Sequence, residues 1–82
     1  MTCKIQRTEI TMLTGEHDPI DSHEFTSRED AERWLRDAVP NLTGGHIEEI
    51  FANANTTFTT QEMINRYEAA YWGAVEYQID VA

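Results

Sequence analysis

Apolar and polar residues alternate strictly in the last stretch of the chain. The apolar positions are Val75, Tyr77, Ile79 and Val81, and charged or amide residues separate them. A period of two is typical of a strand with one buried face and one face in water. Residues 3–13 are rich in Ile and Thr and lack Pro and Gly, which predicts a first strand. We expect the last strand to pair with the first.

A change of apolar face divides the first strand. Cys3 and Ile5 fall on one face, and Ile10 and Met12 fall on the other. Successive side chains of a strand point to opposite faces. The change between Arg7 and Ile10 therefore predicts a β-bulge, or a strand that is covered on both sides.

The middle of the chain combines a turn with helical periodicity. Residues 14–19 have turn chemistry, and a short second strand at 20–25 is expected to close a hairpin. Two later segments carry apolar residues at the spacing i, i+3, i+4 and i+7, which places those residues on one helix face. They predict a helix over residues 28–38, with Ser27 as its N-cap, and a second helix over 47–54.

A third helix is expected to start at a capping box. Thr59 and Glu62 have the spacing of that motif, and Phe58 and Met63 occupy the two hydrophobic-staple positions around it. Gly73 would follow the helix as its C′ residue. The residues expected on its inward face are Met63, Tyr67 and Ala70.

These elements predict one α+β domain that spans residues 1–82, in the order β-β-α-α-α-β. A small three-stranded antiparallel sheet with three helices packed on one face would bury every apolar stripe at once. The chain is 40% hydrophobic and contains two Trp residues, so it has enough apolar material for a core and is not of the disordered class.

Charge narrows the class of partner. The chain has 15 acidic and 6 basic residues, a net charge of −9. This balance opposes direct binding to nucleic acid and to anionic membranes, and it favours a basic protein surface. No apolar run approaches the roughly 18 residues of a membrane span. One cysteine and no apolar N-terminal leader lead us to expect a cytoplasmic protein.

The acidity is concentrated between residues 8 and 32. This segment holds eight carboxylates and one cation, Arg28, so it contributes −7 of the −9. Such carboxylates can imitate the phosphates of a nucleic acid toward an Arg- or Lys-lined groove. Alternatively, they form a solvated face that keeps the protein soluble. The residues expected to bind the partner are Glu9, Glu16, Asp18, Asp21, Glu24, Glu29, Asp30 and Glu32.

No residue pattern matches an enzyme or a metal site. Glu16, His17 and Asp18 have neither EF-hand nor zinc-site spacing. Cys3 lacks the cations that would activate a thiol, and His46 is not tied to a nucleophile. We expect a protein without catalytic activity, metal or cofactor.

Aromatic residues near the C-terminus allow a second interpretation. Most of Tyr67, Tyr71, Trp72 and Tyr77 should be core, but either Tyr71 or Trp72 is expected to face outward as an interface anchor. The chain would then be a small adaptor or self-associating structural module that uses a sheet edge and the Tyr71/Trp72 region, as a monomer or a homodimer.

The run FTSREDAERWL at residues 25–35, continued through Pro40 to Ile47 and Glu48, resembles the strand-to-helix stretch of small acidic anti-CRISPR and anti-restriction proteins of bacteriophages. The likeness covers less than a third of the chain and transfers no residue role. It implies a phage-type inhibitor that acts in the host bacterial cytoplasm. Such an inhibitor would block a nucleic-acid-binding defence complex, such as a CRISPR surveillance or restriction complex, by steric and electrostatic protein binding.

Overall fold

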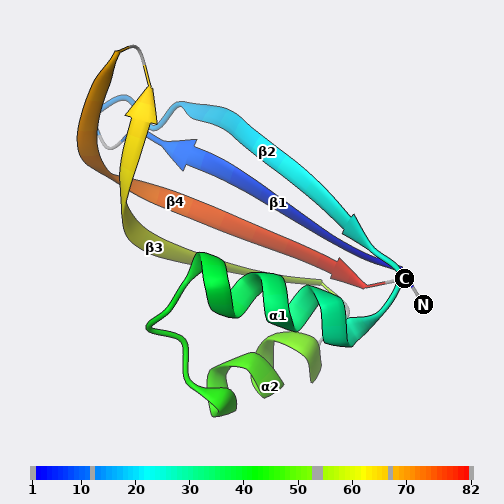
Figure 1. Ribbon diagram of the computed structural model, residues 1–82. Helices are drawn as coiled ribbons and strands as arrows, with labels where there is room; N and C mark the ends of the chain where they lie inside the picture. Colours follow the sequence, from blue (N-terminus) through cyan, green and yellow to red (C-terminus); the bar gives the residue numbers. More distant parts are fainter. Residues whose placement is uncertain (1, 12, 53–54, 67, 82) are drawn as a thin grey trace.

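Two helices lie on one face of a four-stranded antiparallel sheet (Figure 1). The computed structural model describes residues 2–11, 13–52, 55–66 and 68–81. In chain order the elements are β1 (Cys3–Ile10), β2 (His17–Phe25), α1 (Arg28–Ala38), α2 (Gly44–Ala52), β3 (Asn55–Arg66) and β4 (Ala69–Val81). The strands are arranged in the order β2-β1-β4-β3, so β2 and β3 form the two edges.

The predicted count of three strands and three helices is wrong, because the region expected as a third helix forms β3 and the first half of β4. Residues 56–60 contain four threonines, and β-branched residues favour a strand. Burial alternates along most of β3, as it does in a strand with one covered face. Thr59 and Glu62 have the spacing of a capping box by coincidence, since Glu62 hydrogen-bonds Tyr77 of β4.

The expected inward face of that helix is wrong for the same reason. Met63 is 51% exposed, Ala70 is exposed, and Gly73 lies inside β4 rather than after a helix. Tyr67 lies outside the described residues. A strand turns every second side chain to the other face, so residues three or four apart no longer share one.

Several predictions for the first half of the chain are confirmed, although β1 ends at Ile10 and β2 begins at His17, inside the turn predicted over residues 14–19. β1 and β2 form an antiparallel hairpin whose register shifts between Arg7 and Thr8, but the extra residue, Ile20, belongs to β2 and β1 keeps an unbroken register with β4, so the bulge predicted within the first strand lies in its partner. Ser27 caps α1, and its hydroxyl accepts a hydrogen bond from the backbone N–H of Asp30. Residues 74–81 of β4 pair with the whole of β1, as expected for the last and first strands. Met12 lies outside the described residues.

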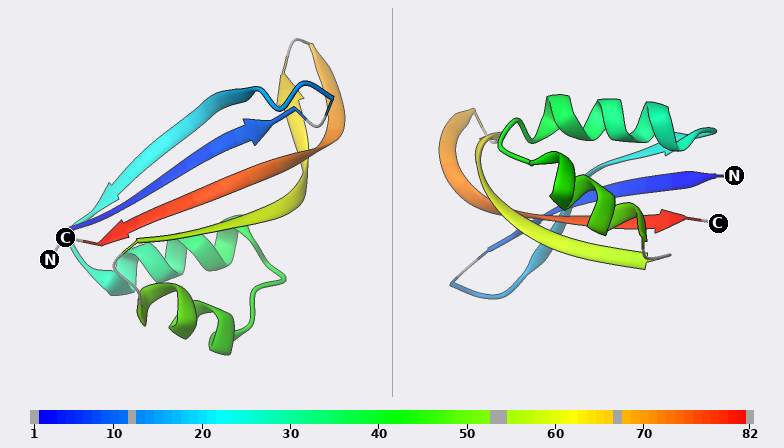
Figure 2. Two further views of the ribbon diagram at one scale, coloured as in Figure 1. Left: turned by 180° about the vertical axis from the view of Figure 1, so that it is seen from behind. Right: turned by 90° about the horizontal axis from the view of Figure 1, so that it is seen from below.

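The core lies between the helices and the face of the sheet that they cover, here called the inner face (Figure 2). Ala31 and Leu35 of α1 and Ile47 of α2 are at most 1% exposed. They pack in one cluster with inner-face residues that include Ile5 and Ile79. The opposite side, the outer face, carries no helix.

The far end of the β3–β4 hairpin bends toward the side that carries the helices (Figure 2). A buried carboxylate fixes this bend to β1. Glu9 is 7% exposed, and it accepts hydrogen bonds from Arg66 Nη1 at 2.9 Å and from the Tyr71 hydroxyl at 2.9 and 3.0 Å. Gly73 provides the space, since a Cβ there would lie 2.6 Å from Ile64 Cδ1.

We predict that Gly73→Ala lowers the free energy of unfolding by about 1–3 kcal/mol, because Ile64 is buried and cannot move aside freely. Urea denaturation measures this loss. In an Ile64→Val background, which removes the Cδ1 methyl, the same substitution should cost clearly less. Gly45→Ala is the control, because its Cβ would have no contact closer than 3.9 Å. An equal cost of Gly73→Ala in both backgrounds would contradict the proposed steric cause.

Candidate functional site

The eight carboxylates of the acidic segment do not share one continuous surface. Glu16 and Asp18 lie at the turn end of β2, whereas Glu29 and Asp30 lie in the first turn of α1. β2 separates the two groups, and its nine residues span about 30 Å of extended chain. Glu9 faces the interior.

Asp21 and Glu32 are engaged by arginines. Arg7 Nε donates to Asp21 Oδ1 at 2.8 Å, and Arg7 Nη2 donates to Asp21 Oδ2. The hydrogen bond from Arg7 holds the pKa of Asp21 below its usual value, against the opposing effect of burial. Arg28 bridges Glu32 and Glu48 from α1 to α2. These two acidic residues therefore help to hold the fold together.

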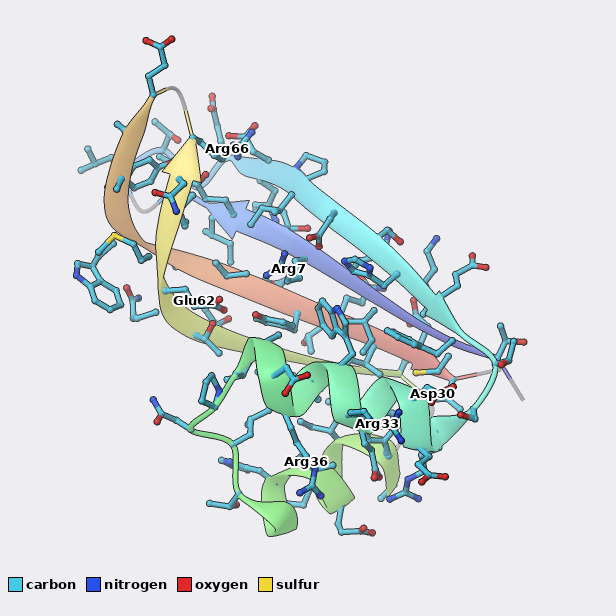
Figure 3. The ribbon with its side chains drawn as sticks, viewed as in Figure 1. Arg7, Asp30, Arg33, Arg36, Glu62 and Arg66 are labelled. Atoms are coloured by element: carbon cyan, nitrogen blue, oxygen red, sulfur yellow. The ribbon has the colours of Figure 1, made fainter. Side chains whose placement is uncertain are left out.

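The other five carboxylates of the segment remain accessible. Glu16, Glu24, Glu29 and Asp30 are exposed and Asp18 is half-buried. Arg33 lies 3.9 Å from Glu29 and 3.7 Å from Asp30, on the outside of α1 (Figure 3), and exposed pairs of this kind hold weakly. Two separate acidic areas result, one at each end of β2.

The remaining sequence candidates do not assemble into a chemical site. Among the described residues, no group of three or more His, Cys, Asp or Glu is arranged to hold a metal ion. Cys3 is buried, and burial raises the pKa of its thiol. Across the same residues, no helix has the length and apolarity to cross a membrane.

The two edges of the sheet differ in how they are protected. β2 contains Pro19, a register shift and charged side chains, features that discourage pairing with another strand. β3 has 12 residues, and residues 50–61 of the chain contain no Asp, Glu, Lys, Arg or His. The first seven residues of β3, 55–61, are therefore an uncharged edge that can act as a template for another strand, whereas Glu62 and Arg66 carry charge in its second half.

A groove of about 930 Å³ runs beside β3, between that strand, the end of α1, the α1–α2 connection and α2. Its apolar lining includes Val39, Leu42, Ile50 and Phe58. The lining contains two carboxylates, Glu49 and Glu62, and no Lys or Arg. The groove therefore combines an apolar floor with negative charge.

Glu62 is held in place by hydroxyl groups. Its Oε2 atom accepts hydrogen bonds from Tyr77 at 2.6 Å and from Thr60. Tyr77 has no exposed surface, and burial, followed by the proximity of Glu62, raises the pKa of its phenol. The Tyr77 ring stacks on Phe58 at 4.9 Å between centroids. Arg7 and Glu62 both lie on the inner face (Figure 3).

An apolar pair lies on the outer face of the same hairpin. Trp72 is 70% exposed and Met63, its direct partner across β3 and β4, is 51% exposed. Tyr71 is half-buried and directs its hydroxyl to Glu9. Trp72 is therefore the outward-facing aromatic of the two.

Comparison with known proteins gives no match to a protein-family model, to a curated protein or to a solved structure.

Sequence reasoning missed β3, its groove and Glu62 as functional features. One signal was present: residues 56–60 contain four threonines, and β-branched residues favour a strand. The position of β3 at an edge depends on the order of the strands, which residue type does not specify.

We predict that the Arg7–Asp21 pair makes stability depend on pH. The pKa of Asp21 is lower in the folded state, so the unfolded chain binds the proton more tightly. The ionised Asp21 therefore adds to the free energy of unfolding at neutral pH. This contribution is lost as the pH falls below about 4. Urea denaturation from pH 7 to about pH 3 should show Asp21→Asn less stable at pH 7, with a difference that shrinks on acidification. A difference that is constant over this range would contradict the linkage. Glu24→Gln, which alters an exposed carboxylate of the same strand, should not reproduce the effect.

Proposed function

We propose that this chain acts by binding another protein, without catalysis, and that it takes an extended segment of that protein as an additional strand on β3. The observation that carries the proposal is the edge position of β3, uncharged over residues 55–61, beside an open groove. Two binding modes support each other there: backbone pairing along the edge and side-chain burial in the groove.

The edge offers enough hydrogen-bonding groups for such a partner. In an antiparallel strand, alternate residues direct both N–H and C=O away from the paired neighbour. For the 12 residues of β3, this leaves about six residues facing outward. Strand addition uses these main-chain groups for affinity and reads alternate side chains for specificity.

Side chains on both faces would meet the added strand. Alternate residues of that strand would point toward the groove, next to Phe58 and Glu62, or toward Met63 and Trp72 on the outer face. An exposed Trp is a common anchor in protein interfaces. The net charge of −9 favours a basic segment and opposes the competing occupant, a second copy of this chain.

Two adjacent proline substitutions test the proposal. Neighbouring residues of β3 direct their N–H groups alternately toward and away from β4, so one of Thr59→Pro and Thr60→Pro removes a bond to β4 and the other removes a donor at the free edge. The variant that remains folded by circular dichroism should lose the partners that the wild type captures from a bacterial lysate. Retention of those partners would contradict strand addition. If the wild type sediments as a dimer and the same variant sediments as a monomer, the occupant of the β3 edge is a second copy of this chain and not a segment of another protein.

A second candidate function is inhibition of a nucleic-acid-binding defence complex. It is favoured by the exposed carboxylates Glu16, Glu24, Glu29 and Asp30 and by the resemblance of residues 25–35 to anti-CRISPR proteins. The acidic areas at the two ends of β2 would contact separate basic regions of the complex, in place of a single imitation of a nucleic-acid strand. Such contacts would block the approach of target DNA by electrostatic repulsion and by steric exclusion.

For this candidate, we expect the chain to reduce target-DNA binding by at least one member of a panel of reconstituted type I CRISPR surveillance complexes and restriction enzymes. The paired reversals Glu16→Lys with Asp18→Lys, and Glu29→Lys with Asp30→Lys, should each weaken inhibition about tenfold or more, because each removes attraction and adds repulsion. Mobility-shift titrations at increasing salt should also show weakening. Inhibition that survives both reversals would exclude an electrostatic mechanism.

A further inference from the structure

We propose that Glu62 is the receptor for a Lys or Arg side chain in the segment that pairs with β3. The inference rests on the proposed strand addition and goes beyond it, because it assigns the chemistry of one position of the bound segment. Three features of the groove support it: the orientation of the carboxylate, the distribution of charge and the position of Phe58.

The orientation of Glu62 is fixed before any ligand arrives. Both described hydrogen bonds to its carboxylate, from Tyr77 and Thr60, end on Oε2. Tyr77 is fully buried between the strands and the helices, so its hydroxyl is a rigid support. Among the described residues, no donor is assigned to Oε1. One carboxylate oxygen is therefore held beside the groove and remains able to accept a hydrogen bond from a ligand.

The cations of the inner face are already engaged by other carboxylates. Arg7 binds Asp21 with two nitrogen atoms and lies 5.5 Å from the centre of the Trp34 ring. Arg66 donates to the buried Glu9. No ion pair within the described chain involves Glu62, and the lining of the groove contributes no Lys or Arg. A cation from outside would compensate this charge in a partly desolvated place, where attraction is stronger than in water.

Phe58 suits the stem of a basic side chain. Phe58 and Glu62 both lie on the inner face of β3, with Thr60 between them, and alternate residues of a strand lie roughly 7 Å apart. A Lys or Arg that is paired beside Thr60 could lay its methylene groups against the exposed part of the Phe58 ring and reach Glu62 with its charged end. This arrangement would select for Lys or Arg at one position of the bound segment.

A display library of random octapeptides tests the assignment. Selection on the wild-type protein should enrich Lys and Arg about tenfold at one fixed position, the gain expected for a hydrogen bond to a charged group. Glu62→Gln keeps an acceptor for Tyr77 and Thr60 but removes the charge, and it should abolish that positional preference. Glu24→Gln removes the same charge from an exposed position on the far edge and should retain the preference, which separates a specific contact from general attraction to an acidic protein.

The best peptide then allows a double-mutant cycle. Replacement of its basic residue by norleucine should weaken binding about tenfold to the wild type and have no effect with Glu62→Gln. Equal losses with both proteins, or enrichment of peptides without a basic position, would overturn the role of Glu62 and leave strand addition in place. If the wild type enriches no peptide, or if the folded β3 proline variant still binds the selected peptides, strand addition and the role of Glu62 both fail. Circular dichroism melting of Glu62→Gln checks that the fold persists.

Discussion

The fold depends on the pairing of β4 with two strands at once. β4 bonds to β1 along one side and to β3 along the other, so it joins the N-terminal hairpin to the edge strand that follows the helices. The helices close over part of the inner face, and β3 remains beyond their cover with the groove at its side. Tyr77 of β4 connects these regions, because its ring belongs to the core and its hydroxyl supports Glu62. The core and the candidate site are therefore joined through Tyr77, and they also share Val39 and Ile50, which line the groove.

Signals contained within a few consecutive residues predicted structure well. The Ser27 cap and the first helix are both present, because each is decided by neighbouring residues, whereas the bulge expected in the first strand lies across from it in β2. The third helix failed because its residues combine a capping box with β-branched threonines, which favour a strand. Pairing with β4, further along the chain, decides between the two signals. The strand order, and hence the free edge of β3, arises from such long-range pairings and could not be obtained from periodicity alone.

The acidic segment shows why charge along a sequence differs from charge on a surface. Residues 8–32 hold eight carboxylates and only one cation, which predicted a concentration of negative charge but not whether it forms one continuous face. The fold extends this segment along β2 and supplies cations from outside it, Arg7 to Asp21 and Arg66 to Glu9, a residue 57 positions away. Conversely, Glu62 lies in a stretch with few charges, and it becomes a distinct negative group because the neighbouring arginines are already engaged.

The uncharged part of the β3 edge, residues 55–61, also bears on how the protein behaves at high concentration. Its long threonine-rich strand has no lysine or proline over residues 55–61, the usual guards against edge-to-edge association. Mutual repulsion between copies that each carry −9 takes over that role. This protection depends on solution conditions as well as on the fold. The repulsion disappears near the isoelectric point of about 4.5 and is screened in concentrated salt. The colloidal stability of this protein therefore depends on the charge of its remaining surface, and a segment bound along β3, as proposed above, would also shield this edge from association.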